Sequence, residues 1–236
     1  NRENRVTLEN SLSSINENIL KLRQKNNSMT ASSESESKAL RDKESELFRL
    51  NALQDAAYGN SEGQSIKWLE KSGLSKNKRI AQNLNVANGW EIAVETVLGD
   101  YLEGLCMNSM QQAIDTVKDF KEGRVTLIDN KCSSNNGDFN PETLASKVEN
   151  APDAIYLLLE NVFVANSLDH ATEIVEHSAK NISAITSKGV WLGKDWLRLF
   201  HEKSKNESSF ISREKSIRML EKKIKELIFN NNRAED

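Results

Sequence analysis

Apolar residues near the start of the chain recur with the alternating spacing of three and four residues that defines a coiled-coil seam. The seam begins at Leu8, Leu12, Ile15, Ile19 and Leu22, and after a polar interval it returns at Leu40, Leu47 and Leu50. On a helix these side chains share one face, which must pack against a partner helix to leave water. Because serine is a weak helix former, the stretch SMTASSESES at 28–37 predicts a soft or kinked zone in this helix.

The end of the chain carries the same pattern. Its seam residues are Phe210, Ile217, Leu220, Ile224 and Leu227, with Arg213 at the one polar seam position. We therefore expect two arms, residues 1–54 and 206–236, that pair in antiparallel fashion with the rest of the chain at the turn. The alternative is two unrelated helices, which would expose their leucines to water. Residues 1–35 have no obvious partner and are left to fray or to pair with another chain.

Composition narrows the fold class and the cellular compartment. Of 236 residues, 28% are charged and 37% hydrophobic, and only ten glycines and two prolines interrupt them, too few for an all-β fold. No apolar run is long enough to cross a membrane, and no signal peptide is apparent. Two cysteines indicate a reducing compartment rather than a disulfide scaffold. The chain begins at Asn1 in mid-pattern, which we interpret as a fragment of a longer protein.

Residues 55–205 predict a mixed helix and strand core. Apolar residues from Trp90 to Leu98 occupy one helical face, Gly99 is placed to end that helix, and Leu102–Met107 predicts a short strand. Ser109 then begins a capping box for another helix, and RVTLID at 124–129 predicts a second strand.

A similar order recurs 58 residues later, where Ser109 aligns with Ser167, Ala113 with Ala171 and Val117 with Val175. The core is therefore predicted to be an α+β or α/β fold with two helix–strand–helix–strand units. The first half covers about 64–128, a polar linker 129–143, and the second half about 144–200. Coincidence between two ordinary α/β units is the alternative.

Catalytic and metal-binding patterns are missing from this core. The segment from Gly189 to Asp195 is one residue too short for a phosphate-binding loop and ends in aspartate instead of Ser or Thr. His170 and His177 could share a helix face, but they lack cysteine or carboxylate partners at useful spacing. We expect no enzyme activity in this chain, no metal and no cofactor, and Cys106 is interpreted as a buried apolar residue.

Two clusters of basic residues flank the junctions between core and arms. The DNA-binding candidates are Lys67, Lys71, Lys76, Lys78, Arg79, Lys203, Lys205 and Arg213. The net charge of -3 argues against binding nucleic acid over the whole surface but not against a local patch. Phosphate contacts need no sequence-specific readout. The alternative is ordinary solvated lysines on helix faces.

Three segments resemble the hinge domain and adjoining coiled coil of bacterial SMC (structural maintenance of chromosomes) proteins. These are VANGWEIAVETVLGDYLEGLCMNS at 86–109, LENVFVANSLDHATEIV at 159–175 and FISREKSIRMLEKKIKEL at 210–227. The resemblance implies a hinge with two subdomains between antiparallel coils, which joins two copies into a homodimer. It also implies a role in chromosome condensation and segregation, in the cytoplasm at the nucleoid.

The resemblance further implies that ATPase heads and the sites for kleisin-type subunits lie outside this chain. Family hinges carry glycines at the subunit contact, and the matching segment here is SKGVWLGKDW at 187–196, where bulky Trp191 stands between the glycines. The dimer contact is therefore predicted at Gly189, Trp191, Gly193, Leu102, Leu105 and Met107. The coiled-coil seam is predicted at Leu40, Leu47, Leu50, Ile217, Leu220, Ile224 and Leu227.

Two other functions remain open from the sequence. The core could be a ligand-binding or catalytic α/β domain inserted in a coiled coil, which would need a cleft with convergent polar groups. The chain could also be a scaffold that binds a protein partner through its unpaired N-terminal helix. Neither has a motif that identifies a ligand.

Overall fold

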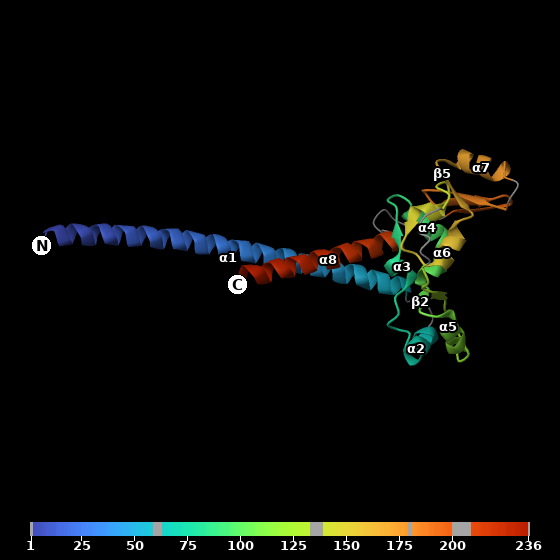
Figure 1. The fold of residues 1–236 in the computed structure, drawn as a ribbon, viewed down its shortest axis with the longest axis horizontal. Helices are drawn as coiled ribbons and strands as arrows, with labels where there is room; N and C mark the ends of the chain where they lie inside the picture. The colour runs from blue at the N-terminus through green and yellow to red at the C-terminus, as the bar shows by residue number, and fades with distance from the viewer. Residues whose placement is uncertain (1, 59–62, 133–138, 179–180, 200–208, 236) are drawn as a thin grey trace. The chain divides into compact units, whose positions relative to one another are not determined.

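The fold is seen in a computed structural model, which describes residues 2–58, 63–132, 139–178, 181–199 and 209–235 (Figure 1). The chain divides into two compact units. One unit contains Asn1–Arg49 and Arg218–Asp236, and the other contains Leu50–Ile217.

Two long helices supply the arms: α1 spans Arg2–Tyr58 and α8 spans Phe210–Glu235. Helix α1 runs through the serine-rich stretch without a break, so the soft or kinked zone predicted there does not interrupt the helix. Its hydroxyls bond within the helix instead of breaking it. The Ser28 hydroxyl donates to the Lys25 carbonyl at 2.8 Å, and the Ser32 hydroxyl donates to the Glu36 carboxylate at 3.2 Å. Such local bonds satisfy serine without a change of backbone.

The first half of the core contains short elements around a parallel strand pair. They are α2 (Gly63–Lys71), α3 (Ile80–Asn83), β1 (Asn85–Val86), α4 (Glu91–Leu98), the 3₁₀ helix η1 (Gly99–Glu103), β2 (Leu105–Met107), α5 (Met110–Val117) and β3 (Leu127–Asp129). Helix α4 ends at Gly99 as predicted, with a φ of 48°. The predicted strand starts late, because Gly99–Glu103 forms the 3₁₀ helix.

The second half repeats this plan and adds a hairpin. Its elements are η2 (Leu144–Lys147), β4 (Val148–Glu149), α6 (Asp153–Leu159), β5 (Val162–Ala165), α7 (Leu168–Glu176), β6 (Ser183–Thr186), β7 (Val190–Gly193) and β8 (Trp196–Leu199). In each half two parallel strands are joined through a helix, β2–α5–β3 and β5–α7–β6. The predicted repeat is therefore present. Only one of its two serine caps forms, because the Ser167 side chain accepts from the His170 N–H whereas Ser109 makes no side-chain cap.

Strands β7 and β8, which continue in antiparallel order from β6, were not predicted from the sequence. They extend the second half to a sheet of order β5-β6-β7-β8, with α7 lying against it (Figure 1). Strand β1 of the first half pairs in antiparallel fashion with β4 of the second half, which connects the two halves. One apolar core spans both halves, with Ala93 and Leu98 of α4 packed in the same cluster as Ile155 and Ile185. The two repeats therefore fold around shared side chains.

Candidate interaction site

Three of the residues predicted at a dimer contact lie inside the core instead. Leu102, Leu105 and Met107 are each no more than 3% exposed. Both edges of β2 are also occupied. Strand β3 pairs with one edge, and on the other the N–H of Ile80 bonds to the Gly104 carbonyl at 2.8 Å and the N–H of Cys106 to the Lys78 carbonyl at 2.8 Å. These side chains and this strand cannot contact a partner while the core is intact.

The glycines of the second half are also interior, because β7 is paired on both sides. Gly189 is buried in the turn before β7, where its φ is 79°. Gly193 is buried beneath the ring of Trp196, and a β-carbon at Gly193 would come within 2.4 Å of that ring. Trp191 is half-buried, and its indole N–H donates to the Ser183 hydroxyl at 2.9 Å. Its ring packs edge to face against the ring of Trp196, with 4.9 Å between the ring centroids. The absence of a side chain at Gly193 therefore lets the Trp196 ring pack against the β7–β8 hairpin.

Strand β8 is the exposed surface that this segment supports. All four of its residues are exposed, including Trp196, Leu197 and Leu199 at 46%, 53% and 63%. Strand β7 pairs with its inner edge, and within the described part of the chain no backbone group pairs with its outer edge. The opposite edge of the same sheet is covered, since the Val164 N–H bonds to the Glu142 carbonyl at 2.8 Å. A bare apolar edge strand is a template for pairing with another chain.

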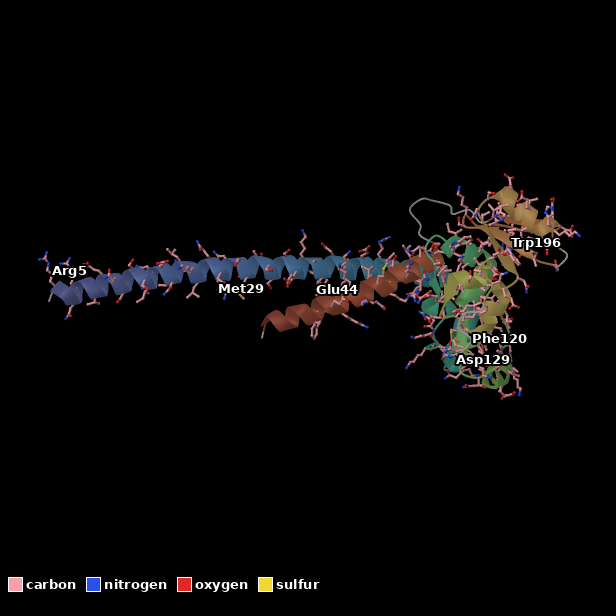
Figure 2. The ribbon with its side chains drawn as sticks, turned by 45° about the horizontal axis from the view of Figure 1, so that its top comes forward. Arg5, Met29, Glu44, Phe120, Asp129 and Trp196 are labelled. Carbon is pink, nitrogen blue, oxygen red and sulfur yellow. The ribbon has the colours of Figure 1, made fainter. Side chains whose placement is uncertain are left out.

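The first half has a matching open edge at β3. One edge of β3 pairs with β2, and among residues the structure describes no backbone group pairs with the other edge along Leu127–Asp129. Figure 2 labels Trp196 on β8 and Asp129 at the end of β3, which lie in different parts of the core unit. The two open edges of one chain are therefore apart from each other.

The predicted DNA-binding residues divide into two groups. Lys67, Lys71, Lys76 and Lys78 are exposed on α2 and the loop after it. Arg79 is half-buried and donates to the Glu103 carbonyl at 2.9 Å. Arg213 donates to the Gln54 side chain at 2.7 Å. Lys203 and Lys205 lie outside the described residues. Four lysines thus remain on one continuous stretch of surface chain.

The predicted seam residues differ in exposure along the arms. Leu50, Ile217 and Ile224 are buried. Leu40, Leu47, Leu220 and Leu227 are half-buried. The apolar residues nearer the N-terminus, from Leu8 to Leu22, are at least 40% exposed. The predicted seam residues are therefore buried or half-buried from Leu40 to Leu50 on α1 and from Ile217 to Leu227 on α8. The apolar residues closer to the N-terminus of α1 are exposed.

A buried carboxylate lies at the beginning of α8. Glu95, on α4, faces the backbone N–H groups of Phe210 and Ile211 and the hydroxyl of Ser209. Burial raises the pKa of Glu95, and the hydrogen bonds from Ile211 and Ser209 and the charge of Arg213 offset only part of this effect. Its Oε2 atom has no hydrogen-bond partner among the described atoms. The carboxylate therefore caps a helix N-terminus at a desolvation cost.

This cost predicts a pH-dependent effect of Glu95→Gln. The pKa of Glu95 in the folded chain is above its ordinary value of 4.5, so the folded chain binds this proton more tightly than the unfolded chain does. The contribution of Glu95 to the free energy of unfolding is therefore largest below pH 4.5, and it falls as the pH rises from 4.5 through the folded pKa. At pH 7 the neutral amide should raise the melting temperature by roughly 1–3 °C. Below pH 4.5 the two proteins should melt alike. Melting curves at both pH values, with exposed Glu142→Gln as control, test this; a lower melting temperature at pH 7 contradicts it.

The core offers little support for a catalytic site. Two open hollows of about 540 and 500 Å³ lie on the core. Tyr156 is among the residues that line the first, and His170 and His177 are among those that line the second. Burial is the main cause of the raised pKa values of Glu95, Glu103 and Cys106, and none of the three lines either hollow. Glu103 lines a much smaller hollow of about 40 Å³, beside Arg79 and Arg124. Cys106 is buried, as predicted. Over the described ranges no three His, Cys, Asp or Glu side chains gather as a metal site, and no helix is apolar enough over sufficient length to cross a bilayer.

Comparisons with known proteins give one consistent match. Residues 75–175 match the family model described as SMC proteins flexible hinge domain. Chromosome partition protein Smc of Coxiella burnetii is 35% identical over 175 residues, 74% of this chain and 15% of the relative. Its namesake in Xanthomonas oryzae is 31% identical over 166 residues, 70% and 14% of the two chains. The chain thus spans about 15% of the length of the curated relatives it matches.

Two solved structures also align with this chain. A structure described as the folded elbow of cohesin aligns with a TM-score of 0.50 at 15% identity, over 94% of this chain and 36% of that one. An asymmetric dimer of the Geobacillus stearothermophilus SMC hinge domain aligns with a TM-score of 0.47 at 21% identity, over 87% and 95% of the two chains.

Proposed function

Because the chain contains an SMC flexible hinge domain between helical arms, we propose that it is a homodimerisation hinge that joins two long coiled coils. The observation that carries this proposal is the exposed apolar edge strand β8, in a domain where the outer edge of β3 also has no backbone partner among the described residues. A soluble chain that leaves such an edge bare risks uncontrolled pairing unless a specific partner covers it.

The two edges suggest how the copies meet. Strand β8 of one copy would add to β3 of its partner, and a twofold axis would repeat the contact between β3 and the partner's β8. Backbone hydrogen bonds would supply the pairing, and Trp196, Leu197 and Leu199 would lose their exposed apolar surface. This contact replaces the one predicted from the sequence at Leu102, Leu105, Met107 and the two glycines.

Sedimentation equilibrium on this chain at micromolar concentration tests the proposal. The expected mass is twice the chain mass of 26.6 kDa. A strict monomer across that range would count decisively against a homodimerisation hinge.

We also propose that Lys67, Lys71, Lys76 and Lys78 form a weak, sequence-independent DNA contact near the junction of core and arm. Their support is exposure and spacing: four lysines within twelve residues, with no ion pair to an acidic side chain among those found in the described chain. Arg79 and Arg213 have hydrogen-bonding roles within the fold, and Lys203 and Lys205 stay predictions.

Reversing the four lysines to glutamate should weaken binding to a random-sequence duplex and flatten its salt dependence. If each lysine faces one phosphate, the slope of log affinity against log salt should shrink by up to about 3.5. Fluorescence anisotropy at several salt concentrations measures it. The control reverses Lys21, Arg23, Lys25 and Lys38 on α1, which are exposed and carry the same total charge. Equal losses for both variants would show a general charge effect and refute the patch.

In the whole protein, we propose a role in chromosome partition, as the names of the relatives suggest. ATPase activity and kleisin-type contacts would belong to parts outside this chain, and the protein would act in the cytoplasm at the nucleoid. Within the chain, we propose arms at 1–54 and 206–236 and a hinge at 55–205. The rival, a ligand-binding or catalytic domain, is disfavoured because Glu95 and Cys106 line none of the hollows described above, and the hollow that Glu103 lines is only about 40 Å³.

A further inference from the structure

A small polar cluster lies where the end of α1 faces the beginning of α8. It consists of Gln54, Arg213 and Glu214, here called the polar clasp. The Gln54 amide donates to the Glu214 carboxylate at 3.1 Å and to the Phe210 carbonyl at 3.4 Å. Arg213 Nε donates to the Gln54 amide oxygen at 2.7 Å. Gln54 is 3% exposed and Glu214 5% exposed, so these bonds are made away from water.

Gln54 occupies a seam position of α1, in the three-and-four spacing of Leu47, Leu50 and Gln54. In an antiparallel helix pair, the numbers of facing residues have a constant sum. The bond between Gln54 and Arg213 sets that sum at 267. The same sum places Leu50 with Ile217 and Leu47 with Leu220, and it places Leu40 with Leu227. These are the seam residues that are buried or half-buried on each helix.

The apolar seam alone cannot select this register. A slip by one heptad would set Leu47 against Leu227 and still pair leucine with leucine. The clasp does not tolerate that slip, because Gln54 would then face Leu220 while Arg213 and Glu214 lost their amide partner. The loss of a hydrogen bond to a buried carboxylate is unfavourable.

We propose that the polar clasp fixes the axial register of α8 on α1, so that the returning coil leaves the hinge with one residue pairing and no other. A polar residue at a single seam position is known to specify register in coiled coils at some cost in stability. Buried ionic groups often add little net stability over apolar replacements of similar size. The clasp therefore contributes selection among registers more than it contributes to the strength of pairing.

Paired cysteines measure the register directly. In a background of Cys106→Ala and Cys132→Ser, one variant carries Leu47→Cys with Leu220→Cys, the in-register pair. A second carries Leu47→Cys with Leu227→Cys, one heptad out of register. Mild oxidation followed by peptide mass spectrometry reports cross-links within one chain. With the clasp intact, the in-register pair should cross-link and the shifted pair should give at least tenfold less product.

The deciding variant replaces the clasp with apolar residues: Gln54→Leu, Arg213→Leu and Glu214→Leu together. We expect the shifted pair to cross-link to an extent comparable with the in-register pair, while the melting temperature is unchanged or higher. If the apolar variant cross-links only in register, the proposal is overturned. Should the triple variant lose its helical circular dichroism signal, Gln54→Met is judged by the same two pairs, and a sole in-register product again overturns the proposal.

This inference does not rest on dimerisation, since both cysteines belong to one chain. A monomeric hinge with a single register would refute the proposed function and leave the clasp standing. A dimer with two registers would do the reverse.

Discussion

Replacing Leu197 and Leu199 on β8 with aspartate is expected to convert the hinge dimer into monomers, weakening self-association by at least about 100-fold. Both side chains lie on the same face of β8 and are more than half exposed in the single chain, so the substitutions need not disturb its core. In the proposed dimer both would be covered, and the twofold axis would bury four carboxylates. Each buried, unpaired carboxylate opposes association.

Sedimentation velocity across a range of concentrations measures this effect. The matched control is Leu157→Asp on α6, because Leu157 and Leu199 are both 63% exposed. The control should remain a dimer, and circular dichroism should show the same melting for all three proteins. An unchanged dimer in the β8 variant would reject β8 as the contact, whereas loss of the dimer in both variants would point to a nonspecific effect of charge.

The elements that the sequence predicted well are those with strong local periodicity. The helix from Glu91 to Leu98 has one apolar face and a glycine at its end, and both features act within a single helix. The repeated strand–helix–strand order was found because Ser167 caps its helix and the flanking strands are β-branched and apolar. The arms followed from the heptad spacing. The serine-rich stretch, where a soft or kinked zone was predicted, stays helical, and its hydroxyls bond within the helix.

The dimer contact could not be predicted in the same way, because burial depends on pairing between distant segments. Leu102, Leu105 and Met107 are as apolar as an interface would be, and only the pairing of Lys78 and Ile80 with β2 shows that this strand is interior. In SKGVWLGKDW the glycines suggested a contact. Two short runs rich in apolar residues, VWLG and WLRL, on either side of the two-residue turn Lys194–Asp195, were the available signal for a hairpin.

The polar clasp shows the same limit on a longer scale. Arg213 was recognised as the polar position of its seam, but its partner Gln54 lies 159 residues earlier. Nothing in either local pattern links them. Once one hydrogen bond fixes the pair, a constant sum of residue numbers assigns the remaining seam contacts.

Truncating Ile155 to alanine is expected to destabilise both halves of the hinge together. Ile155 is fully buried in the cluster that also contains Leu98 of the first half and Ile185 of the second. Removing a buried side chain of this size costs about 2–5 kcal/mol, because the contacts are lost and a cavity remains. For a chain of this length the melting temperature should fall by roughly 5–15 °C.

The control for this prediction lies on the same helix. Leu157→Ala removes a side chain of equal size that is 63% exposed, so it should change stability by no more than about 0.5 kcal/mol. Urea unfolding at a fixed protein concentration, followed by hydrogen exchange, resolves the two halves. Because they share one core, amides near β2 and near β6 should lose protection to the same extent in Ile155→Ala. Loss confined to the β6 side would mean that the repeats fold as independent units, and the shared core would then not be what couples them.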